Sequence, residues 1–114
     1  MASKKDELME KYAADIRSKF NQDPDLILLE KVVDALGPAI YNRDASTVSS
    51  SSESELETVK QNFLIKKLGL EDTDALMAAI GKTMSQYGTS VRTKYRAVVY
   101  YILALEFNKQ EVYD

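Results

Sequence analysis

The chain has 114 residues, 45% of them hydrophobic and 29% charged, a composition typical of an ordinary globular domain rather than a disordered chain. It contains neither cysteine nor histidine, which excludes disulfide bonds, sulfur-ligated metals and hydrolysis by a Ser-His or Cys-His pair within one chain. Residues 1–58 hold 7 basic and 12 acidic side chains, and residues 59–114 hold 8 and 6. This mild asymmetry argues against a general nucleic-acid binder, which usually carries a concentrated positive face.

Residues 4–20 have the pattern of an amphipathic helix. Apolar side chains recur at every fourth position, which places them on one helix face; they are Leu8, Tyr12, Ile16 and Phe20. Ser3 is a suitable N-cap.

A second helix is predicted to begin at Asp23 and Pro24, because Asp is a favoured N-cap and Pro a favoured first helical residue. Gly37 and Pro38 are predicted to end it. Its expected buried stripe consists of Leu26, Leu29, Val32, Val33 and Leu36.

Residues 37–53 form the least regular part of the sequence. Residues 39–41 suit a single helical turn or an apolar plug, and the serine run 49–52 is typical of a connector. About 50 residues on either side are too few for two independent cores. We therefore expect one domain, residues 1–114, with a long serine-rich loop.

Two further helices are expected after this loop. The third begins near Ser52 or Ser54, each of which fits a capping box, and ends at Leu68 and Gly69. The fourth extends from a cap at Thr73 to Gly88. Its expected inner face consists of Leu76, Met77, Ile80, Met84 and Tyr87.

The fifth helix is predicted to begin after a cap at Thr89 or Ser90 and to end near Phe107. Residues 97–105 are continuously apolar, and a helix that is apolar on all sides is a buried helix. This stretch has nine residues, whereas a membrane helix needs about 20. Because the N-terminal sequence MASKKDE lacks the apolar run of a signal peptide, we expect a cytoplasmic protein.

The loop residues Tyr41, Asn42, Arg43 and Asp44 are one candidate ligand or partner contact, since binding residues concentrate on loops held by a rigid scaffold. The simpler interpretation is that Asn42 and Asp44 bond their own backbone to shape a turn. The loop also matches a calcium-binding pattern in part, but Thr47 stands where that pattern requires Gly. We therefore expect no bound metal.

The second candidate contact is a basic cluster, Arg92, Lys94 and Arg96, in the expected first turns of the fifth helix. Cations at a helix N-terminus interact unfavourably with the helix macrodipole, so a cluster of cations there requires an explanation. An anion site would supply one. Ion pairing with carboxylates from the acidic first half is the simpler alternative.

Several blocks of sequence together carry a family resemblance. They are residues 10–15 (EKYAAD), 37–42 (GPAIYN), 44–48 (DASTV), 55–59 (ELETV), 62–70 (NFLIKKLGL) and 94–101 (KYRAVVYY). They resemble a small bacterial family of domains of unknown function. The resemblance implies a compact helical protein with a single domain, and it implies no activity and no site residues.

The expected architecture is all-α, a single-domain bundle of about five helices around a central, apolar C-terminal helix. The leading functional hypothesis is a non-enzymatic interaction module that binds a protein partner or a second copy of itself around the fifth helix and residues 39–48. One alternative is a small-anion or nucleotide-binding protein that uses Arg43 and the basic cluster. Another is DNA binding by the fourth and fifth helices as a helix-turn-helix pair, although the negative net charge disfavours nucleic acid. We expect no cofactor, and an enzyme is the least favoured class because no nucleophile is paired with a base.

Overall fold

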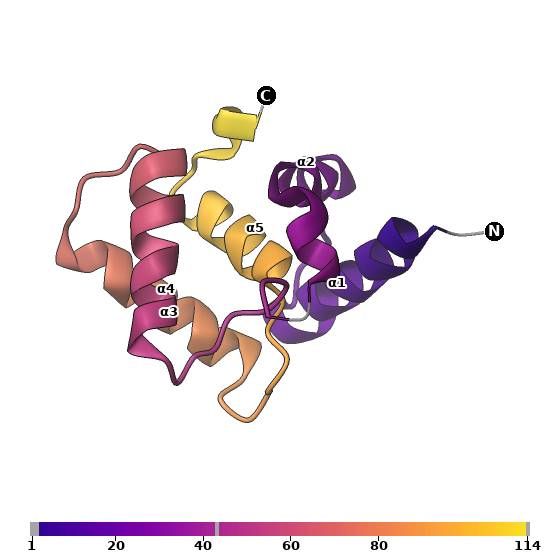
Figure 1. The fold of residues 1–114 in the computed structure, drawn as a ribbon, viewed down its shortest axis with the longest axis horizontal. Coiled ribbons are helices and arrows are strands. Elements are labelled where there is room, and N and C mark those ends of the chain that lie inside the picture. The colour runs from indigo at the N-terminus through magenta and orange to yellow at the C-terminus, as the bar shows by residue number, and fades with distance from the viewer. Residues whose placement is uncertain (1–2, 43, 114) are drawn as a thin grey trace.

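A computed structural model describes residues 3–42 and 44–113. Over these residues the chain forms five α-helices and three other helical segments (Figure 1). They are α1 (Lys4–Phe20), α2 (Leu26–Leu36), the 3-10 helix η1 (Gly37–Tyr41), α3 (Glu53–Thr58), the π-helix η2 (Val59–Lys67), α4 (Asp74–Tyr87), α5 (Arg96–Glu106) and the 3-10 helix η3 (Gln110–Tyr113). Extended pairing in the described part of the chain is limited to one isolated antiparallel bridge between Thr47 and Tyr95. The expected all-α fold is confirmed.

The C-terminal helix α5 lies at the centre of the bundle, as the sequence predicted. It packs against α1, α2 and α4, and Figure 1 shows it between α4 on one side and α1 and α2 on the other. Its buried residues are Ala97, Val98, Val99, Tyr101, Ile102, Leu103 and Ala104. A helix with an apolar surface on nearly every side finds a partner for each side only in this central position.

The predicted start of the second helix is wrong by two residues. Asp25, not Asp23, is the N-cap, and its carboxylate accepts hydrogen bonds from the backbone amides of Ile27 and Leu28 at 3.1 and 3.2 Å. The amide of Asp25 in turn donates to the hydroxyl of Tyr101 at 2.8 Å, which ties the cap to α5. This register leaves Leu26 52% exposed, so its predicted place in the buried stripe is also wrong.

The third helix changes its winding in the middle. Ser52 caps α3 by accepting a hydrogen bond from the Glu55 amide at 3.3 Å, and after Thr58 the helix widens into η2. A hydrogen bond from residue i+5 to residue i puts more residues into each turn than an α-helix has, so residues four, five and nine apart share one side. The buried residues of this segment have this spacing: Val59, Phe63, Leu64 and Leu68.

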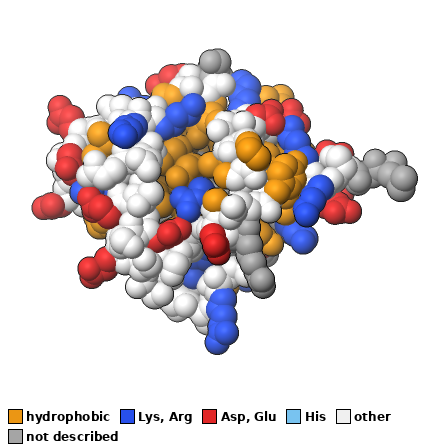
Figure 2. All heavy atoms as spheres, viewed as in Figure 1, with side chains coloured by type: hydrophobic (Ala, Val, Ile, Leu, Met, Phe, Trp, Pro, Cys, Tyr) orange, Lys and Arg blue, Asp and Glu red, His pale blue; other side chains and the backbone are white. Residues whose placement is uncertain are grey.

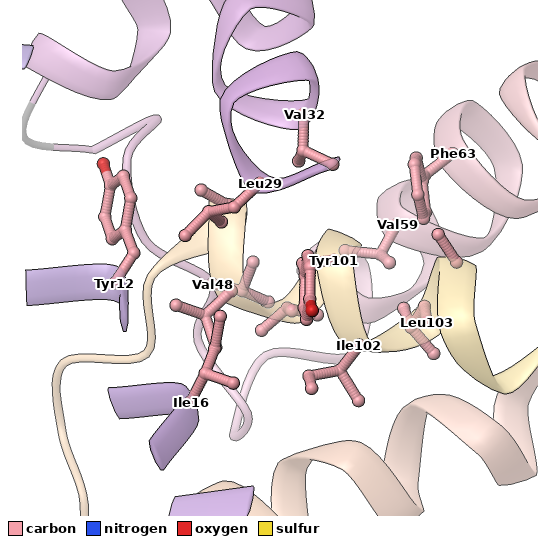
Figure 3. Packing of buried hydrophobic residues seen from close by; sticks show 14 of the residues in the cluster. Tyr12, Ile16, Leu29, Val32, Val48, Val59, Phe63, Tyr101, Ile102 and Leu103 are labelled. Atoms are coloured by element: carbon pink, nitrogen blue, oxygen red, sulfur yellow. The ribbon is translucent and has the colours of Figure 1, made fainter. Parts of the chain in front are cut away.

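Two parts of the irregular region enter the core. Ile40 in η1 is 5% exposed, and Val48 from the serine-rich loop is 1% exposed. Figure 3 shows Val48 among the apolar side chains around α5, near Ile16 and Leu29. Residues 39–41 thus form both a helical turn and part of the packing. In the described ranges no helix has the length and hydrophobicity that crossing a membrane requires.

Gly88 ends α4 with a φ of +124°, a conformation that residues with a Cβ atom rarely adopt. A Cβ atom at this position would lie 2.9 Å from Cγ2 of Val91. We predict that Gly88→Ala lowers the free energy of unfolding by about 1–3 kcal/mol. Gly81→Ala, within α4 and with open space around the new methyl group, is expected to raise it by about 0.5–1 kcal/mol. Urea denaturation of the two variants measures both changes.

Candidate binding surfaces

The serine-rich loop is fastened to the segment that precedes α5. The amide of Val48 donates to the carbonyl of Lys94, and the amide of Arg96 donates to the carbonyl of Ser46, both at 2.8 Å. Together with the Thr47–Tyr95 bridge, these bonds hold the two segments antiparallel. The front of α5 and the loop, which are far apart in sequence, are therefore neighbours.

The predicted start of the fifth helix is wrong. The helix begins at Arg96, and residues 89–95 form an irregular segment that supplies the bridge to Thr47. Arg92 and Lys94 therefore lie outside the helix, and only Arg96 occupies its first turn. The electrostatic conflict that favoured an anion site at the helix N-terminus does not exist for two of the three cations.

The loop residues around Asn42 build a turn. The Asn42 side-chain oxygen accepts hydrogen bonds from the amides of Asp44 and Ala45 at 2.9 and 3.0 Å. Tyr41 is 48% exposed and Asp44 is exposed, whereas Arg43 lies outside the described residues. The Asn42 oxygen that the calcium pattern would use is occupied by backbone amides, and the described residues contain no cluster of three or more acidic side chains suited to a metal ion.

Arg96 joins three elements. Its guanidinium donates to the carbonyls of Ala45 and Thr47 at 2.7 and 3.2 Å, and it pairs with Glu55 of α3 at 2.8 Å. It also donates to the hydroxyl of Tyr100 at 3.1 Å. The Arg96 side chain is only 13% exposed, so these contacts use its hydrogen-bonding capacity within the fold. Pairing with a carboxylate from the first half, the simpler sequence interpretation, describes Arg96.

Lys94 is 2% exposed, which is unusual for lysine. Its ammonium donates to the carbonyl of Val91, and it forms no ion pair with the described residues. Burial lowers the pKa of Lys94 below its ordinary value, because removing the ammonium from water disfavours the charged form. The segment before α5 thus carries a lysine with little exposed surface that pairs with no carboxylate of residues 3–42 and 44–113.

Arg92 is exposed beside the serine-rich loop. It makes no hydrogen bond or ion pair with the described residues, and it lines a hollow with a volume of about 360 Å³. We call this feature the Ser/Arg hollow; its described lining consists of Thr47, Val48, Ser49, Ser50, Ser51, Thr89, Val91 and Arg92. None of these residues is acidic, and five carry a hydroxyl group. The structure thus brings Arg92 to the serine run, while Tyr41 and Asn42 do not line this hollow.

A second surface was missed from the sequence. A groove of about 430 Å³ lies between α1 and α2, lined by Asp6, Met9, Glu10, Ala13, Arg17, Leu26 and Glu30; we call it the α1–α2 groove. Ile27, next to Leu26 in the chain, is 73% exposed. Residues 26–29 are four consecutive apolar residues, and a helix can bury only part of such a run. The run 26–29 could therefore have indicated from the sequence that α2 exposes an apolar surface.

The arrangement of α4 and α5 differs from a DNA-binding helix-turn-helix pair. Residues 88–95 separate the two helices, whereas that motif has a turn of about 3–4 residues. The second helix of the motif must enter the major groove, but α5 is buried by its neighbours. On the face in Figure 2, apolar side chains gather near the middle and charges of both signs surround them, without a continuous positive area.

Comparison with protein families identifies the chain. A family model described as a protein of unknown function (DUF2853) matches residues 11–111. The chain belongs to this family. The resemblance noted in the sequence is therefore confirmed at the level of the family, which carries no assigned activity. A search of the curated proteins gives no match.

We predict that Arg96→Gln lowers the free energy of unfolding by about 2 kcal/mol, since it leaves two partly buried carbonyls and Glu55 without their donor. Arg92 is an exposed arginine four residues earlier, and Arg92→Gln should change the free energy of unfolding by less than about 0.5 kcal/mol. Denaturant unfolding monitored by circular dichroism measures both. Equal losses in the two variants would contradict the structural role of Arg96.

The buried ammonium of Lys94 also predicts a pH dependence. The folded-state pKa of Lys94 lies below its unfolded value, so between these two values the unfolded chain binds more protons and stability rises with pH. The wild type should therefore gain stability relative to Lys94→Met as the pH is raised from 7 to about 10. Unfolding free energies of both proteins across this range test the sign, and the comparison cancels the tyrosines that both proteins share.

Proposed function

We propose that this protein is a non-enzymatic interaction module that binds an apolar, basic segment of another protein in the α1–α2 groove. The observation that carries the proposal is the exposure of Leu26 and Ile27, at 52% and 73%, at the first turn of α2. Single exposed apolar residues are common on protein surfaces. Here two large ones are adjacent, and one of them lines a groove together with Met9 and Ala13.

Hydrophobic burial supplies the affinity in this proposal. Full burial of one leucine or isoleucine side chain is worth about 1.5–3 kcal/mol. Leu26 and Ile27 retain much of that free energy for a partner, because the register set by the Asp25 cap keeps them out of the core. An apolar side chain of the partner would reach Met9 and Ala13 on the groove floor.

Charge on the groove rim supports a basic partner. Three carboxylates, those of Asp6, Glu10 and Glu30, line the groove against one cation, Arg17. Glu10 has no ion pair with the described residues, and Glu30 faces Lys5 only at 3.8 Å. A lysine or arginine flanking the partner's apolar residues would complement this rim and increase the association rate.

The buried hydroxyl of Tyr87 is poorly suited to catalysis. Tyr87 is 1% exposed, donates to the carboxylate of Asp15 and accepts from the amide of Tyr95 at 3.2 Å. Burial, reinforced by Asp15, raises the pKa of Tyr87 far above its ordinary value, so the hydroxyl keeps its proton. Neither residue lines the α1–α2 groove or the Ser/Arg hollow. The pair is better explained as a link between α1 and α4.

The proposed surface differs from the one expected from the sequence. The fifth helix offers few contacts to a partner, since Tyr101 is 1% exposed and Tyr100 stacks on Phe63 with ring centroids 3.9 Å apart. In the 39–48 loop, Tyr41 remains exposed and Val48 is buried. These observations favour the first two helices over the last.

A peptide selection tests the proposal. Random peptides displayed on phage and selected on the wild-type protein should converge on apolar residues flanked by Lys or Arg. A synthetic peptide of the selected sequence should bind the Leu26→Ser/Ile27→Ser variant about tenfold or more weakly, because these residues form the central contact. Fluorescence anisotropy measures the affinity. Tyr41→Ser, which removes an exposed aromatic residue outside the groove lining, is the matched control and should bind as the wild type does.

A charge reversal tests the rim separately. Glu10→Lys should weaken binding of the selected peptide, whereas Glu71→Lys, an exposed glutamate outside the groove lining, should not. Peptides that bind the double serine variant as tightly as the wild type would overturn the proposal. Light scattering provides a further check: a dimer that only the double serine variant dissociates would assign the groove to a second copy of this chain.

A cytoplasmic location is part of the proposal, and cell fractionation tests it.

A further inference from the structure

We propose that the Ser/Arg hollow binds the phosphate group of a small phosphorylated molecule, with the guanidinium of Arg92 as its principal contact and hydroxyls of the serine-rich loop and Thr89 as further donors. This site is separate from the α1–α2 groove: the two linings share no residue. The inference therefore stands or falls independently of the proposed function.

Arg92 is available to a ligand. It is exposed and makes no bond within the described part of the chain, unlike Arg96 four residues later. A guanidinium presents paired N–H donors that match two phosphate oxygens, and charge-assisted bonds of this kind are stronger than neutral ones. An anion would thus meet an arginine whose donors are not already engaged.

The described lining of the hollow consists of groups that can contact a phosphate without repelling it. Ser50 and Thr89 carry hydroxyls that make no hydrogen bond with the described residues, so both can donate to an anion. No described residue of the lining is acidic, and no carboxylate there would repel a phosphate. A volume of about 360 Å³ leaves room for more than the phosphate group itself.

Lys94 provides the second, independent observation. Its ammonium, in a side chain 2% exposed, lies against the carbonyl of Val91, and Val91 forms part of the wall. A buried charge without a counter-charge is costly, and an anion in the hollow would offset part of that cost. Partial desolvation reduces the screening of a charge, so in this proposal the Lys94 ammonium adds to the attraction for an anion without touching it.

The charges in the segment thus have three different surroundings. Arg96 pairs with Glu55, Lys94 is buried and pairs with no carboxylate that the structure describes, and Arg92 lines the hollow. Arg92 is thus the cation that lines the hollow, and Lys94 lies behind its wall, bonded to the carbonyl of Val91. The shared chemistry of these ligands is the phosphate group, and the experiment compares phosphate alone with two phosphorylated molecules.

Binding is measured by titrating the full-length protein with inorganic phosphate, ribose 5-phosphate and ATP, at constant ionic strength maintained with potassium chloride. We expect saturable binding of at least one of these, detected by isothermal titration calorimetry and by a rise in the unfolding temperature. Inorganic phosphate that binds as tightly as the other two would assign the hollow to the free anion. Tighter binding of ribose 5-phosphate or ATP would assign it to a phosphorylated metabolite.

Two variants and one control locate the site. Arg92→Gln should weaken binding at least about tenfold, because it removes the direct charged contact. Lys94→Met should weaken it by a smaller factor, about threefold, through the loss of a charge that does not touch the ligand. Lys66→Gln removes one exposed cation that does not line the hollow and should leave binding unchanged.

Three results would overturn the inference. They are the absence of binding by all three probes at millimolar concentration, an equal loss of binding in Arg92→Gln and Lys66→Gln, and suppression of binding by chloride alone. Circular dichroism confirms that each variant is folded. Since Arg92 is exposed and makes no bond within the described part of the chain, its replacement tests the site without disturbing the fold.

Discussion

The position of Arg96 at the start of the central helix connects the parts of the structure that sequence alone leaves separate. Its guanidinium holds two carbonyls of the serine-rich loop and a carboxylate of α3, while its backbone amide bonds Ser46. Together with the bond from the Val48 amide to the Lys94 carbonyl, these contacts hold the loop across the start of α5, with Val48 in the core. The guanidinium of Arg96, 13% exposed, satisfies carbonyl groups of this irregular segment and so helps to make the segment part of the packed domain.

The same contacts explain how the Ser/Arg hollow forms beside the packed start of α5. The antiparallel bridge between Thr47 and Tyr95 brings the serine run to the segment that precedes α5. Side chains along this extended segment then meet different surroundings: Arg92 reaches solvent and Lys94 is buried. A continuous helix from Ser90 would have distributed these cations around one axis. The short bridge keeps them apart and leaves one guanidinium facing a hollow.

Sequence patterns predicted a helix correctly where one set of residues could form its buried face or its cap. The spacing of Tyr12 and Ile16 and the Ser3 cap predicted α1, and the apolar run 97–105 predicted that the last helix is buried at the centre, although not where it begins. They were insufficient where neighbouring residues offer equivalent signals. Asp23 and Asp25 are both good caps, and only the tertiary bond from the Asp25 amide to Tyr101 decides between them. The π-helical winding of η2 and the bridge to Tyr95 likewise depend on partners distant in sequence. For the candidate sites, the pattern identified Arg92 but not the hollow it faces, and it missed the groove at Leu26 entirely.

The groove at Leu26 is a consequence of how the central helix is held. Because the hydroxyl of Tyr101 accepts the Asp25 amide, α2 begins at Leu26 and its first turn is set by α5. Leu28 and Leu29 then face the core, and Leu26 and Ile27 cannot, since four consecutive residues surround a helix. Their exposure therefore does not reflect a loosely packed helix end, because the cap that causes it is bonded to the most buried helix of the domain. A partner that covers them would bind a surface already held in place, and it would lose little conformational entropy in ordering that surface.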